Sequence, residues 1–267
     1  MLTILRSDLR DMVQELVEYR ELLYSMVWRD LLLRYKQTVM GFGWAILMPV
    51  LYTIVFSMVF MRVAPLDTGM PYPLFAFSGL FAWNLLASSL RFSIGSLTSH
   101  MQLITKVYFP REIFPFATIV VSLVDFGVGL LVVLGLITYY GITPGWTVLF
   151  LPVIIVVQVA FTAGCALLLA LGNLFYRDVK YFFELVLLAW MFATSVLYPI
   201  GHLGGRLASV LGLNPMTPII DAYRSVLIRG ELPPAGPFAA AALVSVVLLL
   251  ASWVLFHRTE FRFAEVI

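Results

Sequence analysis

Four charged residues stand directly before a long apolar run near the amino terminus. Arg29, Asp30, Arg34 and Lys36 precede residues 39–61, which contain no charged residue. Guanidinium and ammonium groups bind phosphate well, so these cations could attract a phosphorylated ligand. They could equally serve only to anchor the chain, because Lys and Arg collect at the cytoplasmic ends of membrane spans. The sequence leaves both interpretations open.

No catalytic constellation accompanies these charges. The sequence contains no G-x-x-x-x-G-K-[ST] phosphate loop, and His100, His202 and His257 are scattered without metal-ligand spacing. Cys165 is the single cysteine, which excludes an intrachain disulfide. We therefore expect no enzyme activity, no metal and no cofactor in this chain.

The composition indicates which elements must carry these residues. The chain is 61% hydrophobic and 12% charged, with a mean hydropathy of +0.97. A soluble domain would be nearer a quarter charged. We predict an all-α polytopic membrane protein that forms one transmembrane domain over residues 1–267, with no signal peptide. Its parts are a cytoplasmic segment, a six-span core and a cytoplasmic tail, over residues 1–39, 40–256 and 257–267.

Hydropathy and length place six membrane-spanning helices in the core. We expect them at about 40–62, 74–90, 116–139, 147–171, 181–198 and 238–256. Lys and Arg number six in 1–39, three in 91–113, and two each in 172–180 and 257–267, against four in the proposed outer segments. This asymmetry predicts that both termini face the cytoplasm.

Two segments outside the spans have distinctive patterns. Residues 7–33 predict an amphipathic helix, lying on the membrane surface or packed on a soluble partner. Residues 199–237 contain the apolar stretch 219–228, which is too short to cross a membrane. It predicts a short re-entrant helix in the outer leaflet, with a surface loop as the alternative.

Asp125 is the one acidic residue deep in a predicted span. Such a residue is a functional candidate by default. The simpler interpretation, which we favour, is a buried carboxyl that is hydrogen-bonded to a neighbour such as Gln158 or kept protonated.

Aromatic side chains gather on the first two predicted spans. Their faces could stack on sugar C–H groups along a substrate channel, or they could pack against helices and lipid. The candidates are Tyr52, Phe56, Phe60, Phe75, Phe81 and Trp83.

The polar connection at 91–113 is a candidate docking segment. A short amphipathic helix ending near Pro110 would project Leu97, Met101 and Ile104 toward a partner, with Lys106 and Arg111 at the rim. The alternative is a helix that rests on the membrane.

Four motifs in chain order resemble the permeases of ABC transporters that export polysaccharides, the Wzm/TagG type of O-antigen and teichoic-acid exporters, related to KpsM capsule exporters. The resemblance covers essentially the whole chain. Its residues are Arg29, Asp30, Arg34, Tyr35, Lys36, Thr38, Gly41, Trp44 and Pro49; Leu103, Ile104, Lys106, Phe109 and Pro110; Tyr176, Arg177, Asp178 and Val179; and Asn214, Pro215, Tyr223 and Arg224.

The resemblance implies a homodimer in the bacterial inner membrane with two copies of a separate ABC ATPase, which binds ATP and Mg²⁺. It implies an undecaprenyl-diphosphate-linked glycan as substrate, a channel bordered by the first, second and fifth spans, and an entrance lined by Trp28, Arg29, Arg34 and Lys36. Residues 91–113 would couple to the ATPase, together with Arg177 and Asp178. An ABC permease for a lipid, drug, teichoic acid or capsule polymer and an ion-coupled secondary transporter are the alternatives.

Overall fold

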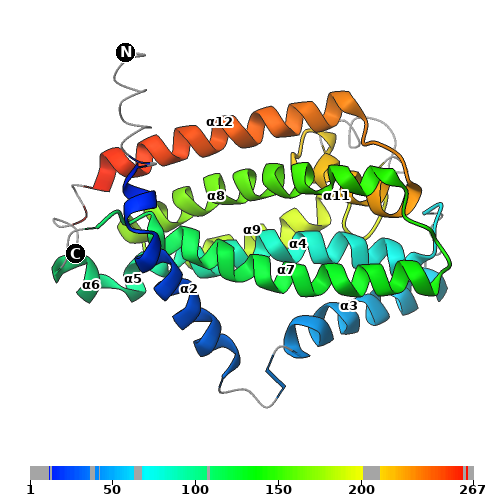
Figure 1. The fold of residues 1–267 in the computed structure, drawn as a ribbon, viewed down its shortest axis with the longest axis horizontal. Helices are drawn as coiled ribbons and strands as arrows, with labels where there is room; N and C mark the ends of the chain where they lie inside the picture. Colours follow the sequence, from blue (N-terminus) through cyan, green and yellow to red (C-terminus); the bar gives the residue numbers. More distant parts are fainter. Residues whose placement is uncertain are drawn as a thin grey trace.

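The computed structural model describes residues 12, 14–36, 40, 41, 43–62, 68–106, 109–200, 211–260 and 263. Within these residues all regular elements are helical. The predictions that concern residues 1–11, 63–67, 201–210 and most of the carboxyl tail lie outside the described residues. Figure 1 shows long helices that run roughly side by side along the long axis of the molecule.

Four helices are long and apolar enough to cross a membrane: α4 (Tyr72–Ile94), α7 (Ile113–Tyr139), η1 with α8 (Trp146–Phe175) and α12 (Ala235–Thr259). They lie where the second, third, fourth and sixth spans are predicted. The prediction of four of the six spans is therefore supported by length and composition.

The other two predicted spans are shorter apolar helices. α3 (Gly43–Arg62) runs through Pro49, whose carbonyl accepts a hydrogen bond of 2.8 Å from the Thr53 hydroxyl. α9 (Val179–Phe192) has 14 residues, which is about 21 Å of helix. The expected continuation of this helix to Tyr198 is wrong, because the chain turns over residues 193–198.

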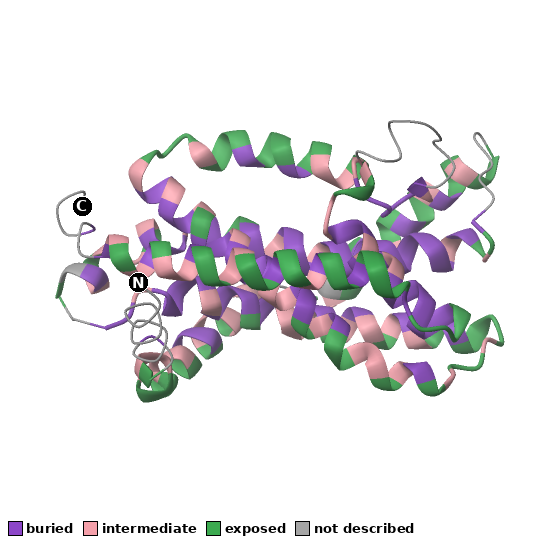
Figure 2. Cartoon of the chain, turned by 90° about the horizontal axis from the view of Figure 1, so that it is seen from above, coloured by how far each residue is buried: buried purple, intermediate pink, exposed green. Residues whose placement is uncertain are grey.

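α4 is the centre of the packing. In the most apolar 18-residue stretch of α4, 83% of the residues are buried, whereas in the corresponding stretch of α12 only 22% are buried. α3, α7, α8, α9 and α11 (Met216–Arg224) all contact it. Figure 2 shows buried residues in the middle of the molecule and exposed residues on the outer helix faces, as expected for a bundle whose outer surface meets lipid.

The two ends of the bundle differ. α2 (Arg20–Tyr35), α5 (Ser96–Ser99) and α6 (Met101–Lys106) lie at one end, and α11 lies at the other (Figure 1). α11 continues into η3 (Ser225–Arg229), so the stretch predicted as a short helix at 219–228 is helical. Residues 14–18 and α2 form the described part of the predicted amphipathic helix, whose position on a membrane stays a prediction.

Candidate functional site

An ion pair joins α2 to the middle of α7. The Asp125 carboxylate accepts hydrogen bonds from the Arg34 guanidinium and from the Tyr35 hydroxyl. The Arg34 and Asp125 side chains are 19% and 23% exposed, so water screens this pair only in part. Burial, together with the hydrogen bond to Asp125, raises the pKa of Tyr35 to about 12, so Tyr35 remains a donor at neutral pH.

The expected bond between Asp125 and Gln158 is wrong. The Gln158 amide donates to the Ala82 carbonyl over 2.6 Å and accepts from the Tyr223 hydroxyl over 2.7 Å. Gln158 therefore ties α8 to α4 and α11. Asp125 is instead neutralised by an arginine that lies 91 residues away in the sequence.

Two cavities lie on either side of the Arg34–Asp125 pair. The first, about 330 Å³, is enclosed by α2, α5, the end of α4 and the start of α7, and Asp30, Arg34 and His100 line it. The second, about 290 Å³, lies between α3, α4 and α7, and Tyr52, Phe81 and Asp125 line it. The ion pair thus stands between one cavity near the α2 end of the bundle and a second cavity further along, and charged side chains line both.

The predicted entrance cations are only partly available to a ligand. Arg29 contacts His100 and pairs with Asp30 over 2.9 Å, while Arg34 is held by Asp125. Lys36 and Trp28 are exposed. The structure thus places Arg34 in the wall of the first cavity, and Arg29 contacts two residues of that wall, Asp30 and His100. Both cations are already bound to carboxylates of this chain.

The six candidate channel aromatics separate into two groups. Tyr52 is 52% exposed, and Phe56 and Phe60 are half-buried, with the Phe60 ring 5.5 Å from Tyr72. Phe75, Phe81 and Trp83 are at most 3% exposed.

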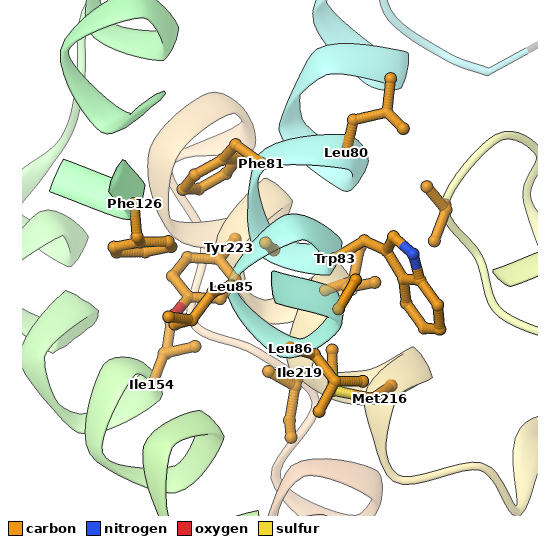
Figure 3. Packing of buried hydrophobic residues seen from close by; sticks show 14 of the residues in the cluster. Leu80, Phe81, Trp83, Leu85, Leu86, Phe126, Ile154, Met216, Ile219 and Tyr223 are labelled. Carbon is orange, nitrogen blue, oxygen red and sulfur yellow. The ribbon is translucent and has the colours of Figure 1, made fainter. Parts of the chain in front are cut away.

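The buried group packs against the chain's own helices. Phe81 stacks on Phe126 at 5.0 Å and meets the edge of Tyr223 at 5.4 Å, and Trp83 contacts Trp190 at 5.9 Å. Figure 3 shows the Phe81 and Trp83 rings on α4, with Phe126 and Tyr223 beside Phe81. The packing interpretation therefore holds for this group, although Phe81 also lines the second cavity.

The predicted docking segment also differs in orientation from what we expect. Leu97 and Ile104 are 0% and 3% exposed, in a cluster with Phe114 and Leu174, so they do not project from the protein. Arg111 is held by Glu260 rather than lying free at a rim. Lys106, Arg177 and Asp178 are exposed and Met101 is half-buried, at the same end of the bundle.

Sequence comparison gives the wider context of this geometry. Residues 21–228 match the family described as "ABC-2 type transporter". The chain belongs to this family. The matched region contains the ion pair, both cavities and α11, and it ends before α12.

Curated relatives of this ABC-2 transporter chain carry a consistent name. The "O-antigen export system permease protein RfbA" of Myxococcus xanthus is 36% identical over 257 residues, which is 95% of this chain and 98% of that protein. Two proteins of the same name from Klebsiella pneumoniae are 28% and 27% identical over 248 residues, 92% of this chain and 95% of each of them. The relatives are named permeases, so this ABC-2 chain is a membrane transport subunit, and its family implies an ABC ATPase partner.

Sequence reasoning missed the role of Arg224 in the ABC-2 fold. Its side chain is 1% exposed and donates to the carbonyls of Ser195, Val196 and Phe75 over 2.6, 2.9 and 3.1 Å. It also pairs with Asp221 over 3.0 Å. The signal was an arginine inside an apolar stretch, which needs several acceptors when it is buried.

Proposed function

We propose that this chain is the transmembrane subunit of an ATP-driven exporter that moves a lipid-linked, O-antigen-like polysaccharide from the cytoplasm across the inner membrane. The observation that carries the proposal is the 36% identity, over nearly all of both chains, to an O-antigen export permease. In this proposal the glycan is linked to undecaprenyl diphosphate. Two copies of the chain form the channel, and two copies of a separate ABC ATPase bind ATP and Mg²⁺.

The cavities suggest a route for such a substrate. The diphosphate would meet the charged cavity beneath α2, and the sugars would pass the aromatic side chains beside Tyr52. The proposal also includes the topology: the chain crosses the membrane six times, α11 is re-entrant, and both termini lie in the cytoplasm. The exposed residues Lys106, Arg177 and Asp178, with Met101, are the candidate contacts to the ATPase, since Leu97 and Ile104 pack inward.

Export by an ion gradient is the weaker alternative. A secondary transporter is expected to carry ionisable groups at the membrane midplane that exchange ions during transport. Asp125 is the one acid in the described part of the four candidate spans, apart from their ends, and Arg34 neutralises it. An ABC permease for a lipid, a drug, teichoic acid or a capsule polymer remains the nearer alternative, and the substrate experiment below distinguishes it.

Deletion of the gene tests the substrate. The deletion strain is expected to accumulate lipid-linked glycan on the cytoplasmic side and to lose it from the surface, with restoration by the wild-type chain. A strain that keeps normal surface glycan would contradict the polysaccharide assignment.

The purified chain is also expected to hydrolyse no ATP by itself and to co-purify with an ABC ATPase when the two are expressed together.

A further inference from the structure

A histidine and two glutamates meet where α7 begins and α12 ends. Glu112 precedes α7, His257 lies in the last turn of α12, and Glu260 follows that helix. One ligand atom from each of the three residues lies within 4.8 Å of the others. Glu112 lies 145 residues before His257 in the sequence, whereas Glu260 follows His257 at position i+3, so the fold brings Glu112 to the other two.

The distances are close to those of a metal site. His257 Nδ1 lies 3.3 Å from Glu112 Oε1 and 3.9 Å from Glu260 Oε2. Zinc bonds to nitrogen and oxygen ligands are about 2.1 Å long, which separates the ligands of a tetrahedral ion by about 3.4 Å. Small side-chain rotations would therefore let all three atoms face one ion.

The Glu112 side chain points to a missing ligand. Glu112 is 1% exposed, and its Oε2 atom has no hydrogen-bond donor among the described residues. A buried carboxylate oxygen without a donor or cation is costly. His257 contacts the other oxygen of this carboxylate, Oε1.

The neighbouring groups resemble an outer shell of metal coordination. The Arg111 main-chain N–H donates to Glu260 Oε1 over 3.2 Å, and Arg111 Nε lies 3.6 Å from the same oxygen. These contacts orient Glu260 and leave its Oε2 atom toward His257. Such hydrogen bonds to the far oxygen of a carboxylate are typical supports of metal ligands.

The negative charges of this cluster suit a divalent cation. Two carboxylates face Arg111 and His257, and Glu15 acts electrostatically on His257 as well. The two carboxylates supply negative charge to a bound divalent ion, and the neutral imidazole of His257 would supply its nitrogen ligand.

We propose that Glu112, His257 and Glu260 bind a divalent transition-metal ion, zinc in the first instance, which fastens the end of α12 to the start of α7. One imidazole and two carboxylates suit zinc better than Mg²⁺ or Ca²⁺, which prefer oxygen ligands alone. The His257 side chain is 21% exposed, so water can reach the site and would fill a fourth position.

The test measures zinc directly on the full chain in lipid nanodiscs, with any polyhistidine tag removed. After treatment with a chelator and dialysis, the wild type is expected to bind one zinc per chain in the micromolar range or tighter, and to melt at a higher temperature with zinc than with Mg²⁺. Glu112→Gln, Glu260→Gln and His257→Gln are each expected to weaken zinc binding by about tenfold or more.

Glu184→Gln is the matched control. Glu184 is an exposed carboxylate that pairs with Arg91 over 3.1 Å, away from the cluster, so its loss should leave zinc binding unchanged. Binding no tighter than that of Mg²⁺ would overturn the proposal. So would zinc binding that the three cluster variants do not alter. Because the wild-type measurement needs no variant, a folding defect in the variants cannot rescue a negative result.

Discussion

Arg224 packs closely against Gly79 at the end of the bundle where α11 lies. Gly79 is on α4, and a Cβ atom there would lie 2.4 Å from the Val196 carbonyl oxygen and 2.6 Å from the Arg224 guanidinium. Both neighbours are fixed: the Val196 oxygen belongs to the backbone, and the Arg224 guanidinium donates to five acceptor residues. The absence of a side chain at position 79 therefore allows Arg224 to hold the turn after α9 against α4.

Gly79→Ala is expected to destabilise the protein. Alanine favours a helix by about 1 kcal/mol over glycine, but overpacking against backbone costs about 1–3 kcal/mol, and neither neighbour can move freely. Gly127→Ala on α7 is the control, because a Cβ atom there meets nothing within 4 Å. Melting temperatures in nanodiscs should fall for Gly79→Ala and stay equal or rise for Gly127→Ala. A Gly79→Ala protein with the melting temperature of the wild type would contradict this close packing.

Tyr52 and Phe81 line the same cavity, but their burial differs, so their substitutions should have different effects. Phe81→Ala removes a ring that is 2% exposed between Phe126 and Tyr223, which is expected to cost about 3 kcal/mol of stability. Tyr52→Ala removes a half-exposed ring and should leave the melting temperature nearly unchanged while lowering glycan export. Normal export by a stable Tyr52→Ala protein would show that this ring does not line the route.

At the scale of elements, the Arg34–Asp125 pair decides how α2 lies on α7. α2 carries both donors, Arg34 and Tyr35, in its last turn, and Asp125 is the acceptor for both. The Arg34 guanidinium also lies 4.1 Å from the centre of the Phe92 ring. The end of α2 is thus fixed to the core by polar contacts just before the chain enters α3.

A double-mutant cycle measures this contact. Arg34→Gln and Asp125→Asn should each lower stability, because each leaves a partly buried charge without its partner. The double variant should be less destabilised than the sum of the two, with a coupling energy of about 1–2 kcal/mol. Chemical or thermal unfolding of the four proteins in nanodiscs checks this. Additive effects would mean that the two side chains do not interact.

The sequence was informative about elements whose pattern is local. Long apolar runs predict α4, α7, α8 and α12 to within a few residues, because an apolar stretch in a membrane protein must satisfy its own backbone as a helix. The end of α9 could not be predicted this way. It depends on the carbonyls of residues 195 and 196, which accept hydrogen bonds from Arg224, 29 and 28 residues further along the chain.

The site was less predictable for the same physical reason. Leu97 and Ile104 show apolar spacing that looks the same whether the face turns to a partner or to the chain's own core, and the structure turns it inward. Asp125 can be recognised as unusual from its position, but its partner comes from a different helix. The clusters at Arg224 and Glu112 likewise depend on contacts between distant segments.

At the scale of the whole molecule, the two ends of the bundle differ in the charged residues that they carry. The α2, α5 and α6 end carries the ion pairs of Arg29 and Arg111, and the turn with Arg177 and Asp178 lies there too, since Leu174 packs in the same cluster as Leu97. The turn at 140–145 lies at the α11 end (Figure 1). From the positive-inside rule we predict that the first end faces the cytoplasm.

Cysteine labelling tests this orientation in intact cells. In a background with Cys165→Ala, Thr143→Cys is expected to react with a membrane-impermeant maleimide from outside, and Asp178→Cys only after the inner membrane is permeabilised. Both positions are exposed, so access and not burial decides the result. A permeant maleimide must label both cysteines equally, which controls for their reactivity. Labelling of position 178 in cells with an intact inner membrane would reverse the topology and place the proposed ATPase contacts on the wrong side.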